Sequence, residues 1–220
     1  MLLIISDVHA NLIALKKIFD MINWDEIDMV VHAGDIVGYN PFPNEVIQEF
    51  KLRGVKSILG NHDRAVIYDD YTNFNPYAES AARWTRKKLT EESMRYLTSL
   101  PTRMEFEYDG KRFLMVHGAP FDDDYYLYKW EATEDLLGDY DVLICGHTHV
   151  PFINKFKKGV IINPGSVGQP RDGNPRASYA LYNGEKFIIK RVKYDIDSVV
   201  RRIAEENLPI ILGERLYFGR

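Results

Sequence analysis

The sequence predicts a layered α/β fold, built as a single domain over residues 1–220. Short apolar runs alternate with segments of helical periodicity in the N-terminal part of the chain, and strand patterns joined by turn residues follow later. Apolar residues make up 45% and charged residues 27% of the chain. This composition is ordinary for a globular protein long enough to bury a sizeable core.

The first elements alternate between strand and helix. Apolar runs predict three strands, over residues 2–5, 29–31 and 55–59. After the first strand, Asn11 can cap a helix that places four apolar side chains on one face: Leu12, Leu15, Phe19 and Ile22. Pro43 begins a second helix and Gly54 ends it, because proline suits the first turn of a helix and glycine the position after its last turn.

Residues 68–102 carry no strand pattern and are interpreted as a helical insertion. Pro76 begins a helix that runs to about residue 89. Thr90 caps another helix, and Pro101 follows its end. Because the insertion comes directly after a polar motif described below, we expect it to form a cap beside the functional site.

Strands dominate the remainder of the chain. An Asp-Gly turn joins strands at 104–108 and 112–116 into a hairpin. The other predicted strands cover residues 142–145, 152–156, 160–162, 178–182 and 186–192. A short helix is expected near residues 133–137, and a final helix begins near Asp197.

Five of these strands end in Asp, Asn or His, mostly beside glycine. The five strings are Ser6-Asp7-Val8-His9, His32-Ala33-Gly34-Asp35, Gly60-Asn61-His62-Asp63, His117-Gly118 and Gly146-His147-Thr148-His149. Ligands of open α/β sheets bind at the carboxyl ends of strands, so we expect these strings to meet at one edge. Glycine beside them would let the backbone approach closely.

The chemistry of these side chains indicates a metal centre. Imidazole nitrogens, two carboxylates and an amide oxygen suit Mn, Fe, Zn, Co or Ni better than Ca or Mg. Seven donors are too many for one tetrahedral site but suit two adjacent ions. Asp7 and Asp35 would offset only part of the charge of two divalent ions, and a bridging hydroxide one charge more. The centre would therefore stay positive and attract an anionic phosphate ester, which two metals can hydrolyse by in-line displacement.

The five motifs and their order along the chain resemble those of the calcineurin-like metallophosphoesterase superfamily. The string Asn163-Pro164-Gly165-Ser166-Val167-Gly168 is similar to its small bacterial and archaeal branch of phosphodiesterases and diadenosine-tetraphosphatase-like phosphatases. The resemblance implies the calcineurin-like phosphoesterase fold, a four-layer α/β/β/α sandwich with a dimetal site at the strand ends.

The resemblance also implies a role for each site residue. One metal would be held by Asp7, His9, Asp35 and His149, and the other by Asp35, Asn61, His117 and His147. His62 would protonate the leaving alkoxide as general acid, with Asp63 orienting its ring. We expect manganese as the activating metal. Three residues are candidates for contact with the substrate phosphate: Asn61, His62 and Arg171.

The predicted function is a dinuclear-metal phosphoesterase that cleaves a phosphodiester or phosphomonoester by attack of metal-bound hydroxide. Three alternatives stay open: a non-catalytic metal-binding scaffold of the same fold that serves protein interaction, a phosphoprotein phosphatase and a nuclease. A scaffold would not need His62. The formal net charge of −4 argues against an extended nucleic-acid surface.

The cysteine count and the length of the apolar runs indicate the cellular location of the protein. A single cysteine, Cys145, excludes an intramolecular disulfide and lies in a predicted buried strand. The N-terminal apolar run is too short for a signal peptide, and no stretch reaches membrane-spanning length, so we expect a cytoplasmic protein without a membrane partner. A homo-oligomer stays open.

Some residues beside the motifs keep two interpretations. His32 precedes a motif aspartate and is expected to pack beside the site without ligating a metal. In the 121–130 segment, the acidic residues indicate a solvated loop, whereas the aromatic residues either line a substrate wall or belong to the core or to an interface. Arg171 either contacts substrate phosphate or is a solvated loop residue.

Overall fold

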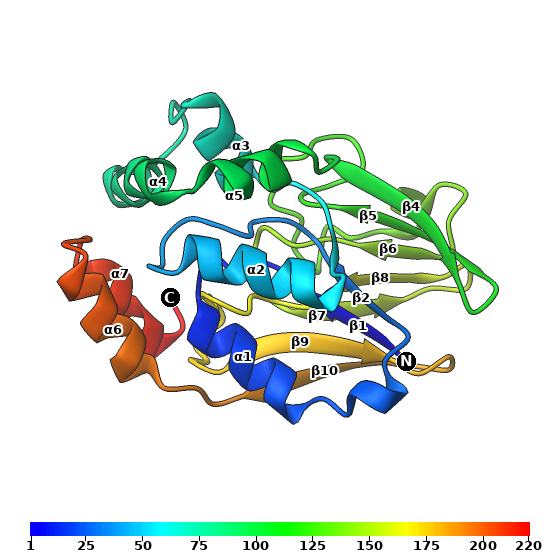
Figure 1. Ribbon diagram of the computed structural model, residues 1–220. Coiled ribbons are helices and arrows are strands. Elements are labelled where there is room, and N and C mark those ends of the chain that lie inside the picture. The colour runs from blue at the N-terminus through cyan, green and yellow to red at the C-terminus, as the bar shows by residue number, and fades with distance from the viewer.

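Two five-stranded mixed sheets form the centre of the molecule in the computed structural model, which describes all of residues 1–220 (Figure 1). The first sheet has the order β10-β9-β1-β2-β3, with β10 (Phe187–Val192), β9 (Ala177–Tyr182), β1 (Leu2–Ile5), β2 (Met29–His32) and β3 (Lys56–Ser57). The second has the order β4-β5-β6-β8-β7, with β4 (Arg103–Tyr108), β5 (Lys111–Val116), β6 (Val142–Ile144), β8 (Val160–Asn163) and β7 (Phe152–Lys155). This arrangement confirms the predicted sandwich.

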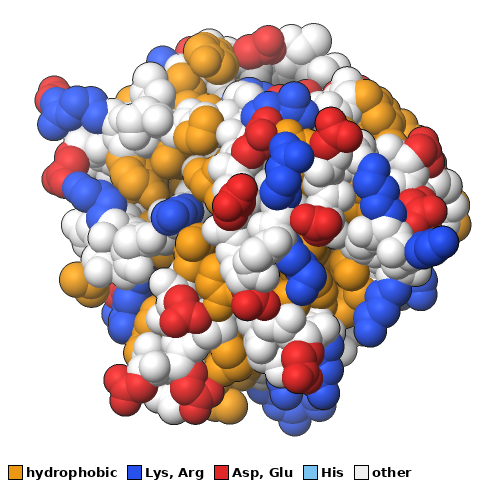
Figure 2. Space-filling view, turned by 90° about the vertical axis from the view of Figure 1, so that its right-hand side faces the viewer, with side chains coloured by type: hydrophobic (Ala, Val, Ile, Leu, Met, Phe, Trp, Pro, Cys, Tyr) orange, Lys and Arg blue, Asp and Glu red, His pale blue; other side chains and the backbone are white.

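Each sheet contains three adjacent parallel strands, β1-β2-β3 and β5-β6-β8. Their carboxyl ends therefore gather at one end of the molecule. Figure 2 shows the opposite end, beside the β4–β5 turn, where acidic and basic side chains are interspersed and no histidine is visible. The histidines that follow the parallel strands lie at the other end.

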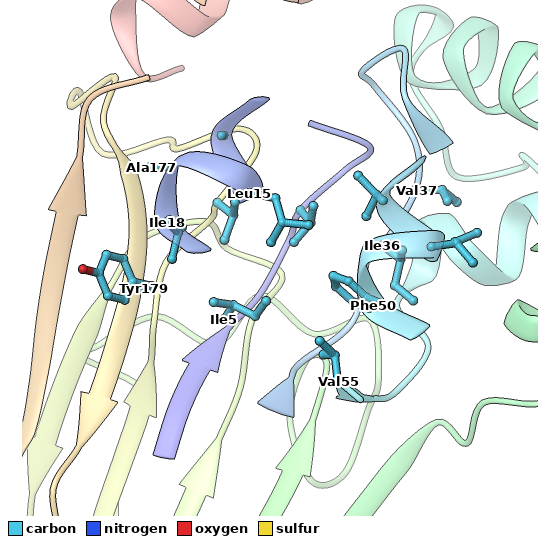
Figure 3. Packing of buried hydrophobic residues seen from close by; sticks show 14 of the residues in the cluster. Ile5, Leu15, Ile18, Ile36, Val37, Phe50, Val55, Ala177 and Tyr179 are labelled. Carbon is cyan, nitrogen blue, oxygen red and sulfur yellow. The ribbon is translucent and has the colours of Figure 1, made fainter. Parts of the chain in front are cut away.

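Alternating apolar residues pack the sheets on both faces. Leu2 and Ile4 of β1 face the second sheet, whereas Leu3 and Ile5 face the helices that cover the outside. These helices are α1 (Leu12–Met21) and α2 (Pro43–Arg53), and Figure 3 shows them packing onto the first sheet. As predicted, the Asn11 side chain caps α1 and Gly54 ends α2 in the left-handed conformation.

The layer outside the second sheet is thinner. Its outer face is covered by the chain between β5 and β6, which contributes apolar side chains such as Leu127 and Leu137. The short helix predicted in this segment is the 3₁₀ helix η2 (Glu134–Leu137). Cys145 lies just beyond the end of β6 and is fully buried in the same cluster.

Helices cluster near the carboxyl ends of the strands. The insertion contains α4 (Pro76–Lys88) and α5 (Glu91–Thr98), capped by Asn75 and Thr90. At the C-terminal end, α6 (Ile196–Glu205), α7 (Ile211–Glu214) and the 3₁₀ helix η3 (Arg215–Phe218) pack against α4 through a shared apolar cluster. A further 3₁₀ helix, η1 (Trp24–Glu26), precedes β2. No helix combines the length and the apolarity needed to cross a membrane.

Two features differ from the sequence-based expectation. The strand expected at 55–59 is reduced to β3, because the Val55 amide bonds to the end of α2 and the Leu59 amide to the Pro101 carbonyl oxygen, at 2.8 Å. A helix that was not expected, α3 (Asn61–Tyr68), follows immediately. Its first turn consists of the polar motif residues Asn61, His62 and Asp63, whose pattern in the sequence indicates a strand-end motif.

Candidate metal centre

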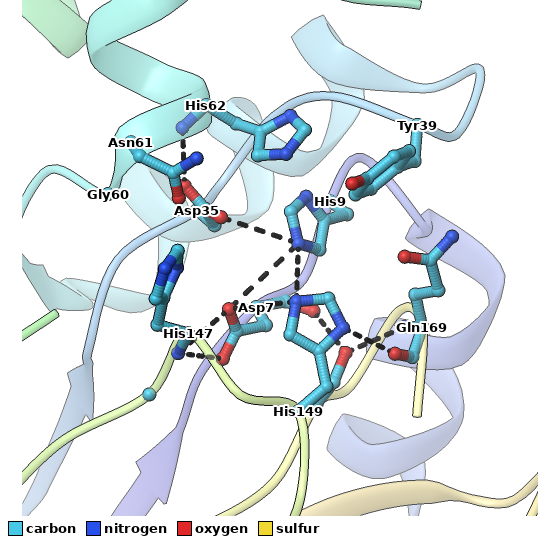
Figure 4. A network of polar contacts seen from close by, with 12 residues as sticks. Asp7, His9, Asp35, Tyr39, Gly60, Asn61, His62, His147, His149 and Gln169 are labelled. Carbon is cyan, nitrogen blue, oxygen red and sulfur yellow. Dashed lines mark hydrogen bonds and ion pairs between the residues drawn. The ribbon is translucent and has the colours of Figure 1, made fainter. Parts of the chain in front are cut away.

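The carboxyl ends of the parallel strands bring all seven predicted donors together. Figure 4 shows these donors except His117. Asp7 and His9 follow β1, and Asp35 follows β2. The other donors are Asn61 at the start of α3, His117 after β5, and His147 and His149 after β6. Six of the seven side chains are buried, and only Asn61 is partly exposed.

The first group of donors contains two carboxylates and two imidazoles. Its members are Asp7, His9, Asp35 and His149, and their donor atoms all lie within 4.8 Å of one another. His9 Nε2 is 3.5 Å from Asp35 Oδ2, and His149 Nε2 is 3.3 Å from Asp7 Oδ1. The two imidazole Nε2 atoms are 3.1 Å apart. These atoms surround a space the size of one ion.

The second group shares one carboxylate with the first. Asp35 Oδ2 lies 3.4 Å from His117 Nε2, which is 3.1 Å from His147 Nδ1. The Asn61 side-chain oxygen is also 3.1 Å from His117 Nε2. Asp35 Oδ2 is thus the atom that both groups have in common.

Backbone carbonyl groups orient three of the imidazoles. The Nδ1 atoms of His9, His117 and His149 lie 3.1, 2.8 and 2.5 Å from the carbonyl oxygens of Val37, Ala33 and Gln169. A carbonyl oxygen can only accept, so Nδ1 carries the proton and the Nε2 lone pair points inward. Inward lone pairs beside two carboxylates form a cluster of acceptors that a cation satisfies. The residues present therefore fit divalent metal.

Electrostatics agree with this conclusion. Burial would raise the pKa of Asp7, but His149 and His117 hold it well below its usual range. Burial alone would lower the pKa of His117, yet the Asp35 carboxylate outweighs it and raises this pKa to about 9. Burial lowers the pKa of His147 to about 3. The centre therefore contains ionised carboxylates close to imidazoles that mostly resist protonation.

The backbone at the site adopts a conformation that few residues tolerate. Five of the seven donors have positive φ: 52° at Asp7, 46° at His9, 63° at Asp35, 64° at His147 and 59° at His149. Non-glycine residues rarely adopt this region, and it is found most often at functional sites. Glycine allows the close packing around them, since a Cβ at Gly60 would clash with Asp35 and one at Gly146 with Ser6.

His62 lies beside the donors without joining either group. Its backbone amide donates to Asp35 Oδ1 at 2.8 Å. Its buried ring packs between Tyr39 and Phe74, each with a centroid 4.4 Å away, and 4.8 Å from the His9 ring. Burial lowers the pKa of His62 to about 4.

Asp63 does not make the contact with the His62 ring that the sequence predicted. Both of its carboxylate oxygens accept hydrogen bonds from backbone amides, those of Asp35, Ile36, Val37 and Gly60, at 3.0–3.2 Å. Burial and the Asp35 charge raise its pKa to about 7, and the amide donors oppose that shift. Asp63 therefore fixes the loop that carries Asp35 and the start of α3.

Other predicted residues surround the centre. His32 is buried with Nδ1 2.8 Å from Ser57 Oγ, the packed position expected for it. Asn163 lies in the wall, where its side-chain amide donates to the Gly146 carbonyl oxygen at 2.7 Å. Arg171 donates to the Tyr39 hydroxyl at 3.0 Å. Tyr39 itself was not predicted, because a single tyrosine after a glycine carries no specific signal.

A cleft of about 530 Å³ opens beside the second donor group. Asn61 and His147 line its floor, and its walls come from α3, the start of the 68–102 insertion and the 121–130 loop. Tyr126 of that loop lies against the His147 ring, with centroids 4.0 Å apart. Arg64 of α3 pairs with Asp124 across the cleft. The loop thus contributes both a wall and an ion pair to the site.

Comparisons with known proteins agree on one family. The profile of the calcineurin-like phosphoesterase superfamily domain matches residues 1–186. The chain is 36% identical to the protein MJ0912 of Methanocaldococcus jannaschii, over 100% of this chain and 98% of that one. It is 22% identical to phosphodiesterase YfcE of Escherichia coli, over 92% and 97%. A metallophosphoesterase structure from Sphaerobacter thermophilus superimposes with a TM-score of 0.86 at 36% identity, over 100% and 98%.

Proposed function

The chain belongs to the calcineurin-like phosphoesterase superfamily, and on this premise we propose that it hydrolyses phosphate esters at a dinuclear metal centre. Its membership of this superfamily and its relatives, which include a phosphodiesterase, make the chain a metal-dependent phosphoester hydrolase. The observation that supports two ions is the sharing of Asp35 Oδ2 by two donor groups, each large enough to hold one ion.

The proposed ligands follow from these groups. Asp7, His9 and His149 would hold one ion, and His117, His147 and Asn61 the other, with Asp35 between them. Divalent ions at these positions would polarise the phosphoryl oxygens and lower the pKa of a bound water, which makes it a nucleophile at neutral pH. Manganese is the proposed activating metal, and the mixed N/O donors also suit Fe, Zn, Co and Ni.

The protein's own residues position the ester and supply the proton. Asn61 lines the cleft at the second group, so its amide is placed to orient a phosphate that enters there. His62 follows it on α3, and its Nδ1 is buried against Gly38, which leaves Nε2 for the substrate. We assign His62 Nε2 the delivery of a proton to the leaving oxygen.

The environment of His62 sets a condition on this role. Because burial lowers its pKa to about 4, the ring is neutral at pH 7 in the free protein. A phosphate anion beside the ring would favour the charged form and raise the pKa. The ring would therefore take up its proton from solvent when the ester binds, so the acid is formed only in the complex.

An activity screen on manganese-loaded protein tests the proposal. It compares an alkyl phosphodiester, a phosphomonoester, a dinucleoside polyphosphate and a phosphopeptide, with metal content measured on the same sample. We expect about two ions per chain and turnover of at least one ester, and the preferred ester separates phosphodiesterase from phosphatase. Full metal content with no turnover of any ester would favour the scaffold alternative.

A further inference from the structure

Two arginines beside the metal centre have no Asp or Glu partner. Among the arginines that are not exposed, three pair with aspartates: Arg64 with Asp124, Arg86 with Asp69 and Arg191 with Asp172. The remaining two are Arg171 and Arg215, and no Asp or Glu oxygen lies within 4.0 Å of either. Arginines withdrawn from solvent are usually paired with an acidic side chain, so this exception requires an explanation.

Both arginines flank Tyr39. Each guanidinium carbon is 5.7 Å from the Tyr39 ring centroid. That ring lies 4.7 Å from the His9 ring and 4.4 Å from the His62 ring, as centroid distances. In Figure 4, Tyr39 and Gln169 lie at one side of the centre, and Asn61 and His147 lie at the other. The arginines are therefore next to the first donor group, across the centre from the cleft.

Their hydrogen bonds leave donors available. Arg171 donates from Nη2 to the Tyr39 hydroxyl at 3.0 Å and to Gln169 Oε1 at 3.1 Å, while its buried Nε has no partner. Arg215 donates from Nε to the main-chain oxygen of Arg220, the last residue of the sequence, at 2.9 Å. A guanidinium carries five N–H donors in a planar fork. Most donors of the two side chains thus have no protein acceptor.

The fold holds the two like charges together. Arg171 lies on the loop that follows β8, whereas Arg215 begins η3. Leu212 and Leu216, which flank Arg215, are buried in the apolar cluster that also contains Tyr39. Burial lowers the pKa of Arg215, and the charge of Arg171 lowers it further. An anion bound close to both groups would offset their mutual repulsion.

We propose that Arg171 and Arg215 form a second anion subsite, which holds a further phosphate or carboxylate group of the ester while the scissile phosphate lies at the metals. The inference rests on the proposed function for the scissile phosphate. Guanidinium groups bind phosphate and carboxylate through paired N–H donors, so both anions suit the pair. The substrate class is therefore a phosphate ester with a second anionic group on the same molecule.

Binding to manganese-loaded protein, measured by calorimetry, tests the subsite. The probes are alkylphosphonates, ω-carboxyalkylphosphonates and α,ω-bisphosphonates of matched chain lengths. The wild-type protein should bind at least one of the dianionic series about tenfold or more tightly than the matched alkylphosphonate, as expected for a charge-assisted contact. The better of the two dianionic series identifies the second group as carboxylate or phosphate. Equal affinity for all three series overturns the proposal.

Variants locate the effect. Arg215→Gln and Arg171→Gln should each remove most of that gain and change alkylphosphonate affinity by no more than about twofold. Arg176→Gln removes the same charge from an exposed position on the Arg171 loop and should leave all affinities unchanged. Equal losses for alkylphosphonate and dianionic probes would show that the arginines only pack against Tyr39, and would overturn the subsite.

Two controls keep the outcomes distinct. Metal content and thermal midpoint are measured for every variant. Arg215→Lys keeps the charge but loses the paired donors, and it replaces Arg215→Gln if that variant unfolds. The lysine variant should lose part of the gain, and an undiminished gain would contradict the role of Arg215. If wild-type protein binds alkylphosphonate equally with and without metal, the proposed function fails. If that binding needs metal but the second anion adds nothing, only the subsite fails.

Discussion

The two donor groups of the metal centre differ in charge and in access. The first combines Asp7 and Asp35 with two imidazoles, and all four side chains are buried. The second has only the shared Asp35 as a carboxylate and borders the cleft through Asn61 and His147. An ion in the first group would be largely neutralised by carboxylates, whereas an ion in the second would keep net positive charge facing an opening. We therefore expect the first group to retain metal and the second to receive the phosphate.

The largest effect should come from the atom that joins the two groups. Asp35→Asn removes the only carboxylate of the second group and one of two in the first. We expect metal content to fall at both positions and ester hydrolysis to be lost. Elemental analysis after manganese reconstitution measures the occupancy. Asp7→Asn is the matched control and should weaken mainly the first group. An Asp35→Asn protein that keeps two ions would disprove the sharing.

Variants of His62 test whether this residue takes part in the reaction without holding a metal. His62→Ala and His62→Asn should keep both metals, because the ring contacts neither group as a donor. They should slow hydrolysis of an alkyl ester on the order of 10²-fold or more, the usual contribution of a general acid. The loss should shrink with p-nitrophenol as leaving group, since that anion departs without a proton. Equal losses on both esters would favour a phosphate-binding role, and loss of metal would show His62 to be a ligand.

Metal removal should separate the groups by affinity. A chelator titration is expected to remove the ion of the open second group first and that of the first group later. Each step should lower the thermal midpoint, because a ligand that binds only the folded state stabilises it by about 2.7 kcal/mol at a free concentration of about 100 times its dissociation constant. Calorimetric scans at successive chelator concentrations follow the steps. A single concerted release would argue against two unequal sites.

The smallest effect concerns the cleft beside the second group. We propose that residues 68–102 act as a cap that influences substrate choice, because Tyr68 and Phe74 line the cleft. Exchange of this segment, or Tyr126→Ala, should alter the ratio of activities between two esters by a few-fold with metal content unchanged. Trp130→Ala provides the control, since Trp130 stacks on Tyr128 and is 78% exposed. An unchanged ratio would reduce the segment to packing.

Much of this centre could be predicted because strand ends obey a simple rule. Apolar runs identify the parallel strands, and the polar residues directly after them must meet at one edge. For this reason the positions of Asp7, Asp35 and His117 follow from pattern alone. The prediction was less successful at β3, where Val55 and Leu59 bond to partners outside the sheet.

The remaining features depend on contacts that no local pattern reports. Backbone amides donate to both carboxylate oxygens of Asp63, and these amides look the same in every sequence. The helix α3 begins with polar residues whose spacing is equally typical of a loop. Arg215 reaches the centre only because the C-terminal helices pack against α4 and Tyr39. The positions of such residues at the site can be assigned only from the tertiary structure.

The position of β1 in the middle of its sheet has a consequence for biosynthesis. Leu2 pairs with Met29 on one side and with Tyr182 on the other, and the Asp7 carbonyl oxygen accepts bonds from Ser166 and Gly168. During translation all seven donors have been synthesised once His149 is added, yet the chain that fixes Asp7 and completes the sheet comes later. The growing polypeptide would therefore carry all of the proposed ligands before it has the geometry to discriminate among metals. On the proposed function, we expect the ion to be selected only late in folding, once β9 has paired with β1.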